Sequence, residues 1–381
     1  MCSYSQVEIN LDDIENNPRK MLHSLNSLRV IFELIIVSSH VSDFGNKNIF
    51  IHSYGTTNCL MSFFFVLSGF VSMYTTDGKD TTYFMRRLKK TYPFYILMWL
   101  SGLPIVIYGN IFMNKCSVHS WIYLFLQPLC LEIFLGWEVE GSNVPAWYYT
   151  VLVILWFIHS YFDLKYWIYD HPLKFMVLFY VFSVMLSIPF FYFDRESVKQ
   201  LPFFRILEFF MGSAVAISFK KGYIMSGKIA YFCFVIYIIF AVFTAAKPKI
   251  WADSVQNGTC IFWKQDDKFW FKPNGLITIT SLIWAIIIHW LACFESSGGS
   301  NLVMNVLEFD FFKNLSKFSL QLYLSHWVTT TYFYHILREL GILNWFSKDF
   351  HMIFAYSASY WLYVYVQPKL DSWVQKLTSK P

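Results

Sequence analysis

The stretch LRVIFELIIVSSH, residues 28–40, is apolar except for its polar end and three ionisable side chains, Arg29, Glu33 and His40. A helix turns about 100° per residue, so all three lie on one face, and His40 lies about 16 Å along the axis from Arg29. An ionisable side chain is costly inside a membrane, so such a stripe must face a polar cavity or other protein groups. The stretch therefore predicts a membrane-spanning helix with a functional polar face.

The same stripe also has a structural interpretation. Arg29 and Glu33 are four residues apart, the spacing of an ion pair on a helix, and His40 would then be a buried neutral side chain. For Glu33 the spacing favours this structural pair, whereas for Arg29 and His40 we favour a functional role.

Composition indicates a membrane protein. Of the 381 residues, 56% are hydrophobic, 21% are aromatic and only 14% are charged, against about 25% charged residues in soluble domains. These values exclude disordered, collagenous, coiled-coil and disulfide-scaffold proteins. The apolar runs are continuous over roughly 17–22 residues rather than alternating, which favours helices over a β-barrel. We therefore predict an all-α bundle of about 10–11 transmembrane spans.

The predicted spans divide the chain into one large domain and two tails. Residues 1–25 form a polar N-terminal tail, residues 26–368 the transmembrane domain, and residues 369–381 a short C-terminal tail. The spans, at roughly 20 residues per crossing, are 27–44, 58–75, 93–110, 119–136, 145–165, 173–193, 201–219, 229–246, 274–294, 315–336 and 349–367.

Basic residues in the loops predict the orientation. The block Arg86-Arg87-Leu88-Lys89-Lys90 lies in the predicted loop 76–92, and such blocks stay in the cytoplasm. The N-terminus is then cytoplasmic as well. A glycosylation sequon at Asn257 conflicts with a cytoplasmic position for the loop 247–273, and this conflict stays open, as does the identity of the membrane.

The chain lacks the sequence patterns of metal and nucleic-acid sites. Its seven cysteines form no CxxC pair and have no histidine partner at metal-ligand spacing, so we expect no metal site. No basic tract with interleaved aromatic residues is present, so we expect no nucleic-acid partner. The lipid bilayer is the expected environment.

Six motifs, in order along residues 25–330, resemble those of the membrane acyltransferase-3 family. They are LRVIFELIIVSSH (28–40), FFVLSGF (64–70), FMRRLKKTYPFY (84–95), PAWY (145–148), PFFRILEFFMG (202–212) and FSLQLYLSHW (318–327). This resemblance implies a helical membrane enzyme that moves an acyl group from acyl-CoA to a hydroxyl group.

The sequence departs from the family pattern at four places, one of which is Leu320 and Gln321 between Ser319 and Tyr323. Residues 60–62, Leu-Met-Ser, precede FFVLSGF where the family usually has a small residue, Val and Asp. Leu152 stands where a branch that acylates bacterial surface sugars has a glutamate, and Glu33 stands where the family usually has a small apolar residue. The missing carboxylate leaves the acceptor open, while the Arg29 and His40 positions match the family.

The predicted catalytic residues are His40, Arg29 and His326. An acceptor hydroxyl needs a general base with a pKa near the working pH, which histidine supplies. His40 lies at the outer end of the first span. Arg29 lies at the inner end, near the basic block, where it suits the phosphates of a CoA donor. His326 either acts as the base, orients His40 or forms a structural hydrogen bond.

The predicted substrate- and donor-binding residues are Arg86, Arg87, Ser68, Glu208, Arg205, Tyr323 and Trp147. Structural alternatives accompany several of them. The basic block is able to fix topology alone, Ser68 with Gly69 suits close helix packing, and Arg205 and Glu208 suit an ion pair. Tyr323, three residues before His326, suits a role in orienting it.

The expected function is an integral membrane O-acyltransferase. It moves an acyl group, acetyl by default, from acyl-CoA as a co-substrate to a carbohydrate or another small hydroxylated acceptor, without a bound cofactor. Two alternatives remain at this stage. One is a multi-span transporter, because buried Arg, Glu and His also suit a transport pathway. The other is an inactive family member that serves as a structural subunit.

Overall fold

The computed structural model describes residues 21–41, 54–76, 79–112, 118–135, 141–192, 201–239, 273–343 and 348–378. Every regular element in these ranges is helical, which confirms the all-α prediction. In chain order the elements are α2 (His23–Val41), α3 (Tyr54–Thr75), α4 (Thr81–Phe112), α5 (Val118–Leu126), η2 (Glu132–Leu135), η3 (Val144–Ala146), α6 (Trp147–Tyr161), α7 (Leu164–Ile168), α8 (Pro172–Tyr192), α9 (Pro202–Lys220), α11 (Pro273–Ser296), α12 (Leu302–Leu307), α13 (Asp310–Ser316), α14 (Ser319–Glu339), α15 (Lys348–Trp361), the π-helix η6 (Leu362–Val366) and α16 (Gln367–Thr378).

Several of these helices suit a multi-pass membrane protein. Within the described residues, three are both long and apolar enough to cross a membrane, namely Thr81–Tyr108, Val144–Tyr161 and Pro202–Lys220. Four shorter apolar helices accompany them, at Cys59–Thr75, Pro172–Ser187, Gly227–Ile239 and Thr280–Ser296. The sequon at Asn257 lies outside the described residues.

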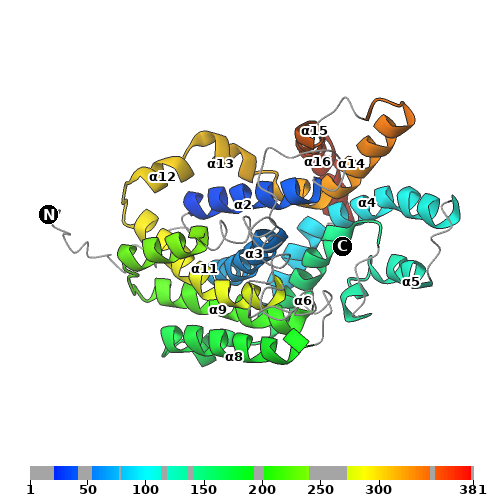
Figure 1. Ribbon diagram of the computed structural model, residues 1–381. Coiled ribbons are helices and arrows are strands. Elements are labelled where there is room, and N and C mark those ends of the chain that lie inside the picture. Colours follow the sequence, from blue (N-terminus) through cyan, green and yellow to red (C-terminus); the bar gives the residue numbers. More distant parts are fainter. Residues whose placement is uncertain are drawn as a thin grey trace, which may run out of the picture.

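The centre of the bundle is a close contact between α3 and α9, with α8 on the far side of α9 (Figure 1). A Cβ atom at Gly69 of α3 would lie 1.8 Å from the carbonyl oxygen of Phe209. At Gly212 of α9, a Cβ atom would lie 1.9 Å from the carbonyl oxygen of Val66. Only glycine lets the two backbones touch at these points, as at other small-residue interfaces of membrane helices. Gly69 therefore has the close helix packing that the sequence analysis gave as the structural alternative for the Ser68-Gly69 pair.

Helix α2 crosses this centre and packs on α3 and α11. The ring of Phe32 contacts those of Phe63 and Trp284 at centroid distances of 4.8 and 5.1 Å. Buried Glu295, near the end of α11, accepts hydrogen bonds from the backbone N–H groups of His23 and Ser24, at 2.7 and 3.0 Å. The carboxylate satisfies orphan donors at the first turn of α2 and complements the positive end of its dipole.

Helices α2 and α14 lie side by side and run parallel. Glu33 of α2 accepts a hydrogen bond from the hydroxyl of Ser319, and His40 contacts His326. The two contacts are seven residues apart on each helix. The same faces of α2 and α14 therefore stay together over two helical turns. The segment from α15 to the start of α16 returns antiparallel to α14. Ser359 of α15 bonds to Ser325, and Gln367, the first residue of α16, bonds to Gln321.

The predicted fourth span, 119–136, is wrong as a single helix. Helix α5 ends at Leu126 because Pro128 disfavours helical geometry at the residue before it. The backbone carbonyls of Gln127 and Pro128 then accept hydrogen bonds from the hydroxyls of Tyr95 and Tyr92, at 2.5 and 2.7 Å. Irregular backbone at membrane depth requires such partners from the protein.

The start of the third span also differs from the prediction. Helix α4 begins at Thr81 rather than at Pro93, so the basic block forms helical turns instead of a loop. Asp80 precedes the helix and accepts hydrogen bonds from the backbone N–H and the hydroxyl of Thr82, at 2.9 and 2.7 Å. This N-terminal cap starts the helix earlier than the proline does.

We expect Gly69→Ala and Gly212→Ala each to lower the thermal stability of the protein. The added methyl group meets a backbone carbonyl, which cannot move aside as a side chain can, and overpacking of this kind costs about 1–3 kcal/mol. Thermal unfolding of the purified protein in detergent measures the effect. Ser68→Ala is the matched control, because it adds no atom at the neighbouring position. Unchanged melting temperatures for both glycine variants would contradict the observed helix contact.

Glu295→Ala is expected to loosen the N-terminal end of α2. The variant leaves two backbone donors without their acceptor, and each unsatisfied buried group costs about 1–3 kcal/mol. Hydrogen exchange at residues 23–27 should increase relative to the wild type. Glu308→Ala, a change at an exposed glutamate, serves as the control. Equal exchange rates in the two variants would show that Glu295 does not hold the helix.

Candidate active site

The structure brings the two predicted catalytic histidines together. Nδ1 of His40, near the end of α2, lies 2.9 Å from Nε2 of His326 in α14. Their rings are nearly parallel, with an interplanar angle of 4° and a centroid distance of 5.1 Å. The ring of Trp327 meets His40 edge-on at 6.1 Å. His326 is fully buried, whereas His40 is half-buried.

Hydrogen bonds to the backbone define which nitrogen of each ring carries the proton. Nδ1 of His326 lies 2.7 Å from the carbonyl oxygen of Tyr323 and 3.2 Å from that of Leu322. Carbonyl oxygens only accept, so this nitrogen donates and Nε2 of the neutral His326 accepts. His40 therefore donates through Nδ1, and its lone pair is on Nε2. The arrangement prepares Nε2 of His40 to take a proton, as in triads where a third group orients the base.

Arg29 and Glu33 contact the α13–α14 segment instead of forming the ion pair that the sequence suggested. An Nη atom of Arg29 donates to the carbonyl oxygen of Ser316 at 3.1 Å. Glu33, 1% exposed, accepts from the hydroxyl of Ser319 through Oε2. Among the described residues no ion pair joins the two side chains. Nε of Arg29 and Oε1 of Glu33 are both buried without a hydrogen-bond partner.

Tyr148, at the start of α6, contacts two of the predicted site residues and is not itself among the residues predicted from the sequence. Its hydroxyl lies 3.3 Å from that of Ser68 in α3, and its ring contacts that of Tyr323 at 5.3 Å. The available signal was the PAWY motif, in which Tyr148 directly follows the selected Trp147. Trp147 itself packs against Phe65, with ring centroids 6.3 Å apart.

Tyr323 supports His326 in a different way from the one predicted. Its hydroxyl donates to the carbonyl oxygen of Pro145 at 2.5 Å, so it ties α14 to η3. Its backbone carbonyl, rather than its side chain, accepts the hydrogen bond from His326. Residues three apart on a helix lie on the same face, so the carbonyl group of Tyr323 lies close to the ring of His326. The same spacing is the reason that the sequence predicted an interaction between these two residues.

Arg205 and Glu208 form the ion pair that the sequence offered as a structural alternative. Their N–O distance is 2.8 Å, and the side chains are 2% and 0% exposed. Ser62 of α3 donates to the second oxygen of Glu208 at 2.6 Å, and the guanidinium lies over the ring of Phe65 at 5.0 Å. Such a pair retains its charges because each is paired and hydrogen-bonded inside the bundle. It ties α9 to α3.

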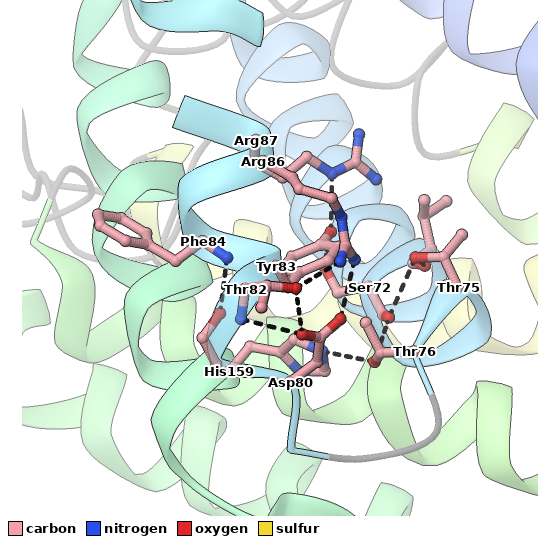
Figure 2. Close-up of polar contacts among 12 residues, drawn as sticks. Ser72, Thr75, Thr76, Asp80, Thr82, Tyr83, Phe84, Arg86, Arg87 and His159 are labelled. Carbon is pink, nitrogen blue, oxygen red and sulfur yellow. Dashed lines mark hydrogen bonds and ion pairs between the residues drawn. The ribbon is translucent and has the colours of Figure 1, made fainter. Parts of the chain in front are cut away.

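Arg86 and Arg87 lie on α4 but differ in surroundings (Figure 2). Arg86 is 58% exposed and bonds to Asp80 at 2.8 Å and to the Thr82 hydroxyl at 2.6 Å. The hydrogen bond from Thr82, together with Arg86, lowers the pKa of Asp80 below its usual value. Arg87 is half-buried and donates through Nε to the hydroxyl of Tyr83 at 3.0 Å.

Two further contacts connect Arg87 with the interior. Its guanidinium lies 5.2 Å from the ring centre of Tyr83 and 6.0 Å from that of Trp156. Within the described residues the terminal nitrogens of Arg87 form no hydrogen bond, so they are available to a ligand.

His159, which matches no motif, belongs to the same polar cluster as Tyr83. Its Nε2 lies 2.9 Å from the hydroxyl of Thr76, and the rings of His159 and Tyr83 are 5.2 Å apart (Figure 2). Lys220, at the end of α9, donates to the carbonyl oxygens of Met73 and Thr76, at 3.1 Å each. The lysine and the histidine thus fix the last turn of α3 next to Arg87.

Taken together, the predicted site residues fall into three groups. Arg29, His40, His326, Tyr323 and Ser68 line one interior between α2, α3, α6 and α14. Arg86 and Arg87 lie at the start of α4. The Arg205–Glu208 pair lies between α3 and α9, and Trp147 packs among aromatic rings.

The comparisons with known proteins support the resemblance seen in the motifs. Neither the curated proteins nor the solved structures include a match to this chain. The family profile described as an acyltransferase domain, of the acyltransferase-3 type, matches residues 22–366, which include every site residue named above. The chain therefore belongs to the acyltransferase-3 family of membrane acyltransferases.

Proposed function

We propose that this protein transfers an acyl group, acetyl by default, from acyl-CoA to a hydroxyl group of a carbohydrate or another small acceptor. The observation that carries this proposal is the hydrogen bond between His40 and His326. It holds the ring of His40 and sets its tautomer, and a positioned base of this kind contributes about 10²–10⁴-fold to rate.

The reaction proceeds by direct transfer between the two substrates. Nε2 of His40 removes the proton of the acceptor hydroxyl as that oxygen attacks the thioester carbonyl carbon. A C–O bond forms, the C–S bond breaks, and the proton passes from His40 to the departing sulfur of CoA. His326 accepts the Nδ1 hydrogen bond throughout and stabilises the imidazolium form of His40. No covalent enzyme intermediate is required.

The donor enters from the end of the bundle that carries Arg87. The terminal nitrogens of Arg87 suit the phosphates of CoA, because a guanidinium forms paired hydrogen bonds with phosphate oxygens. Arg29 is the next cation along the proposed path, and His40 lies about 16 Å beyond it along α2. That span approximates the length of a pantetheine arm. With the basic block in the cytoplasm, the N-terminus is cytoplasmic and the acceptor approaches from the opposite side.

His40→Ala is expected to lower kcat by about 10²–10⁴-fold, because the hydroxyl loses its general base. His326→Ala should lower kcat as well, since His40 loses the partner that sets its tautomer. Transfer of labelled acetyl from acetyl-CoA by the protein in proteoliposomes measures both effects. His335→Ala, a change on the same helix α14 away from the pair, should retain activity. Wild-type transfer by His40→Ala would refute the proposal, and uptake of acetyl-CoA without turnover would favour a transporter.

Arg87→Ala should raise the KM for acetyl-CoA by about tenfold or more, because hydrogen bonds to charged groups contribute about 1.5–3 kcal/mol. Arg86→Ala should change KM much less, since Arg86 is exposed and held by Asp80. Acetylpantetheine, which lacks the nucleotide phosphates, should not distinguish Arg87→Ala from the wild type. If Arg86→Ala and Arg87→Ala raised the KM for acetyl-CoA equally, the proposal that Arg87 binds the CoA phosphates would be contradicted.

A further inference from the structure

Glu33 is a buried carboxylate with one oxygen that forms no hydrogen bond within the part of the chain that the structure describes. Its Oε2 accepts from Ser319, while Oε1 is buried and makes no hydrogen bond. A buried acceptor without a partner costs about 1–3 kcal/mol, and inside a membrane no bulk water compensates for it. Glu132 also has such an oxygen, so the atom indicates a ligand only in combination with the unpartnered donor beside it.

A complementary donor lies one helical turn away. Nε of Arg29 is also buried without a hydrogen-bond partner, although the terminal nitrogen of the same side chain bonds to Ser316. The two unsatisfied atoms are thus one acceptor and one N–H donor on the same face of α2. An amide group presents the matching pair, an N–H and a carbonyl oxygen.

The distance from His40 agrees with the amides of a pantetheine arm. Glu33 lies seven residues before His40, which is about 10 Å along the helix axis. In an extended pantetheine thioester the two amide nitrogens lie about 4 and 9 Å from the sulfur, at bond lengths near 1.5 Å. With the thioester carbonyl at His40, the second amide reaches the level of Glu33.

We propose that Glu33 and Arg29 recognise the amide groups of the pantetheine arm, with Oε1 of Glu33 accepting an amide N–H and Nε of Arg29 donating to an amide carbonyl. This inference rests on the proposed function, because it requires an acyl-pantetheine donor whose sulfur lies near His40. Glu33 is then a specificity-determining residue for the donor. It makes the site select an amide-bearing arm over an apolar thiol of the same length.

Wild-type protein tests the proposal first, with three acetyl thioesters as donors: acetylpantetheine, its analogue in which esters replace both amides, and the thioester of a simple alkyl thiol. Loss of the amide N–H groups should lower kcat/KM by about tenfold or more, because Oε1 of Glu33 then stays buried and unsatisfied. Equal kcat/KM values for acetylpantetheine and the ester analogue would overturn the proposal.

Glu33→Gln is the second test, because glutamine keeps the shape but presents an NH₂ group in place of one acceptor oxygen. With Ser319 bonded to the amide oxygen, that NH₂ group opposes the N–H of the donor. We expect kcat/KM for acetylpantetheine to fall by about tenfold, with the alkyl thioester unaffected. A parallel loss on both donors, or no loss on acetylpantetheine, would overturn the proposal.

Glu132→Gln is the matched control for this variant. Glu132 is also buried, accepts from a hydroxyl (Thr150, 2.6 Å) through one oxygen, and has a second oxygen without a partner. It lies in η2, on the α5–α6 connection, and this element packs against α5 and α6. Glu132→Gln should leave the preference among the three donors unchanged. If it altered that preference as Glu33→Gln does, the role proposed for Glu33 would be contradicted.

The outcomes for Glu33 and for the proposed function are distinguishable. If Glu33→Gln keeps the wild-type donor preference while His40→Ala abolishes transfer, the proposed function stands and the role of Glu33 is refuted. If His40→Ala also retains transfer, the proposed function itself is wrong.

Discussion

The contact of two backbones at Gly69 and Gly212 is the constraint on which the bundle depends. Where a Cβ atom would lie within 2 Å of a carbonyl oxygen on the facing helix, only glycine permits the approach. Because α3 and α9 touch here, the Arg205–Glu208 pair and Ser62 form one buried polar group between them. Lys220 likewise reaches the last carbonyls of α3. The close helix pair therefore supplies the fixed surface on which α2 packs.

Helix α2 connects this surface to the candidate active site. Glu295 of α11 holds its first turn, Ser319 and Ser316 of the α13–α14 segment bond to its middle, and His326 bonds to its end. Each of these bonds joins residues more than 250 positions apart in the chain. In a membrane, polar side chains on one helix must find such partners within the protein. The same requirement is the reason that the two unsatisfied atoms of Arg29 and Glu33 point to a polar ligand.

Much of this architecture could be predicted from the sequence because the signals are local. Long apolar runs with few charges predict helices, and the eleven-residue spacing of Arg29 and His40 places both on one face whatever surrounds them. The prediction failed where local signals compete. Pro93 suggested a helix start, but the cap at Asp80 begins α4 earlier. The apolar run at 119–136 suggested a span, but Pro128 interrupts it and tyrosines of α4 satisfy the freed carbonyls.

The sequence by itself determined the all-helical class, the family motifs and the shared face of Arg29, Glu33 and His40, because these follow from composition and helical periodicity. Tertiary structure alone decided which residues meet. It joined His40 to His326, gave Glu33 a partner in Ser319 rather than Arg29, bonded Glu208 to Ser62 of α3, and gave Arg87 half-buried surroundings while Arg86 stays exposed. The physical reason is that hydrogen bonds between distant segments depend on how helices pack, and spacing along one helix carries no information about its neighbours.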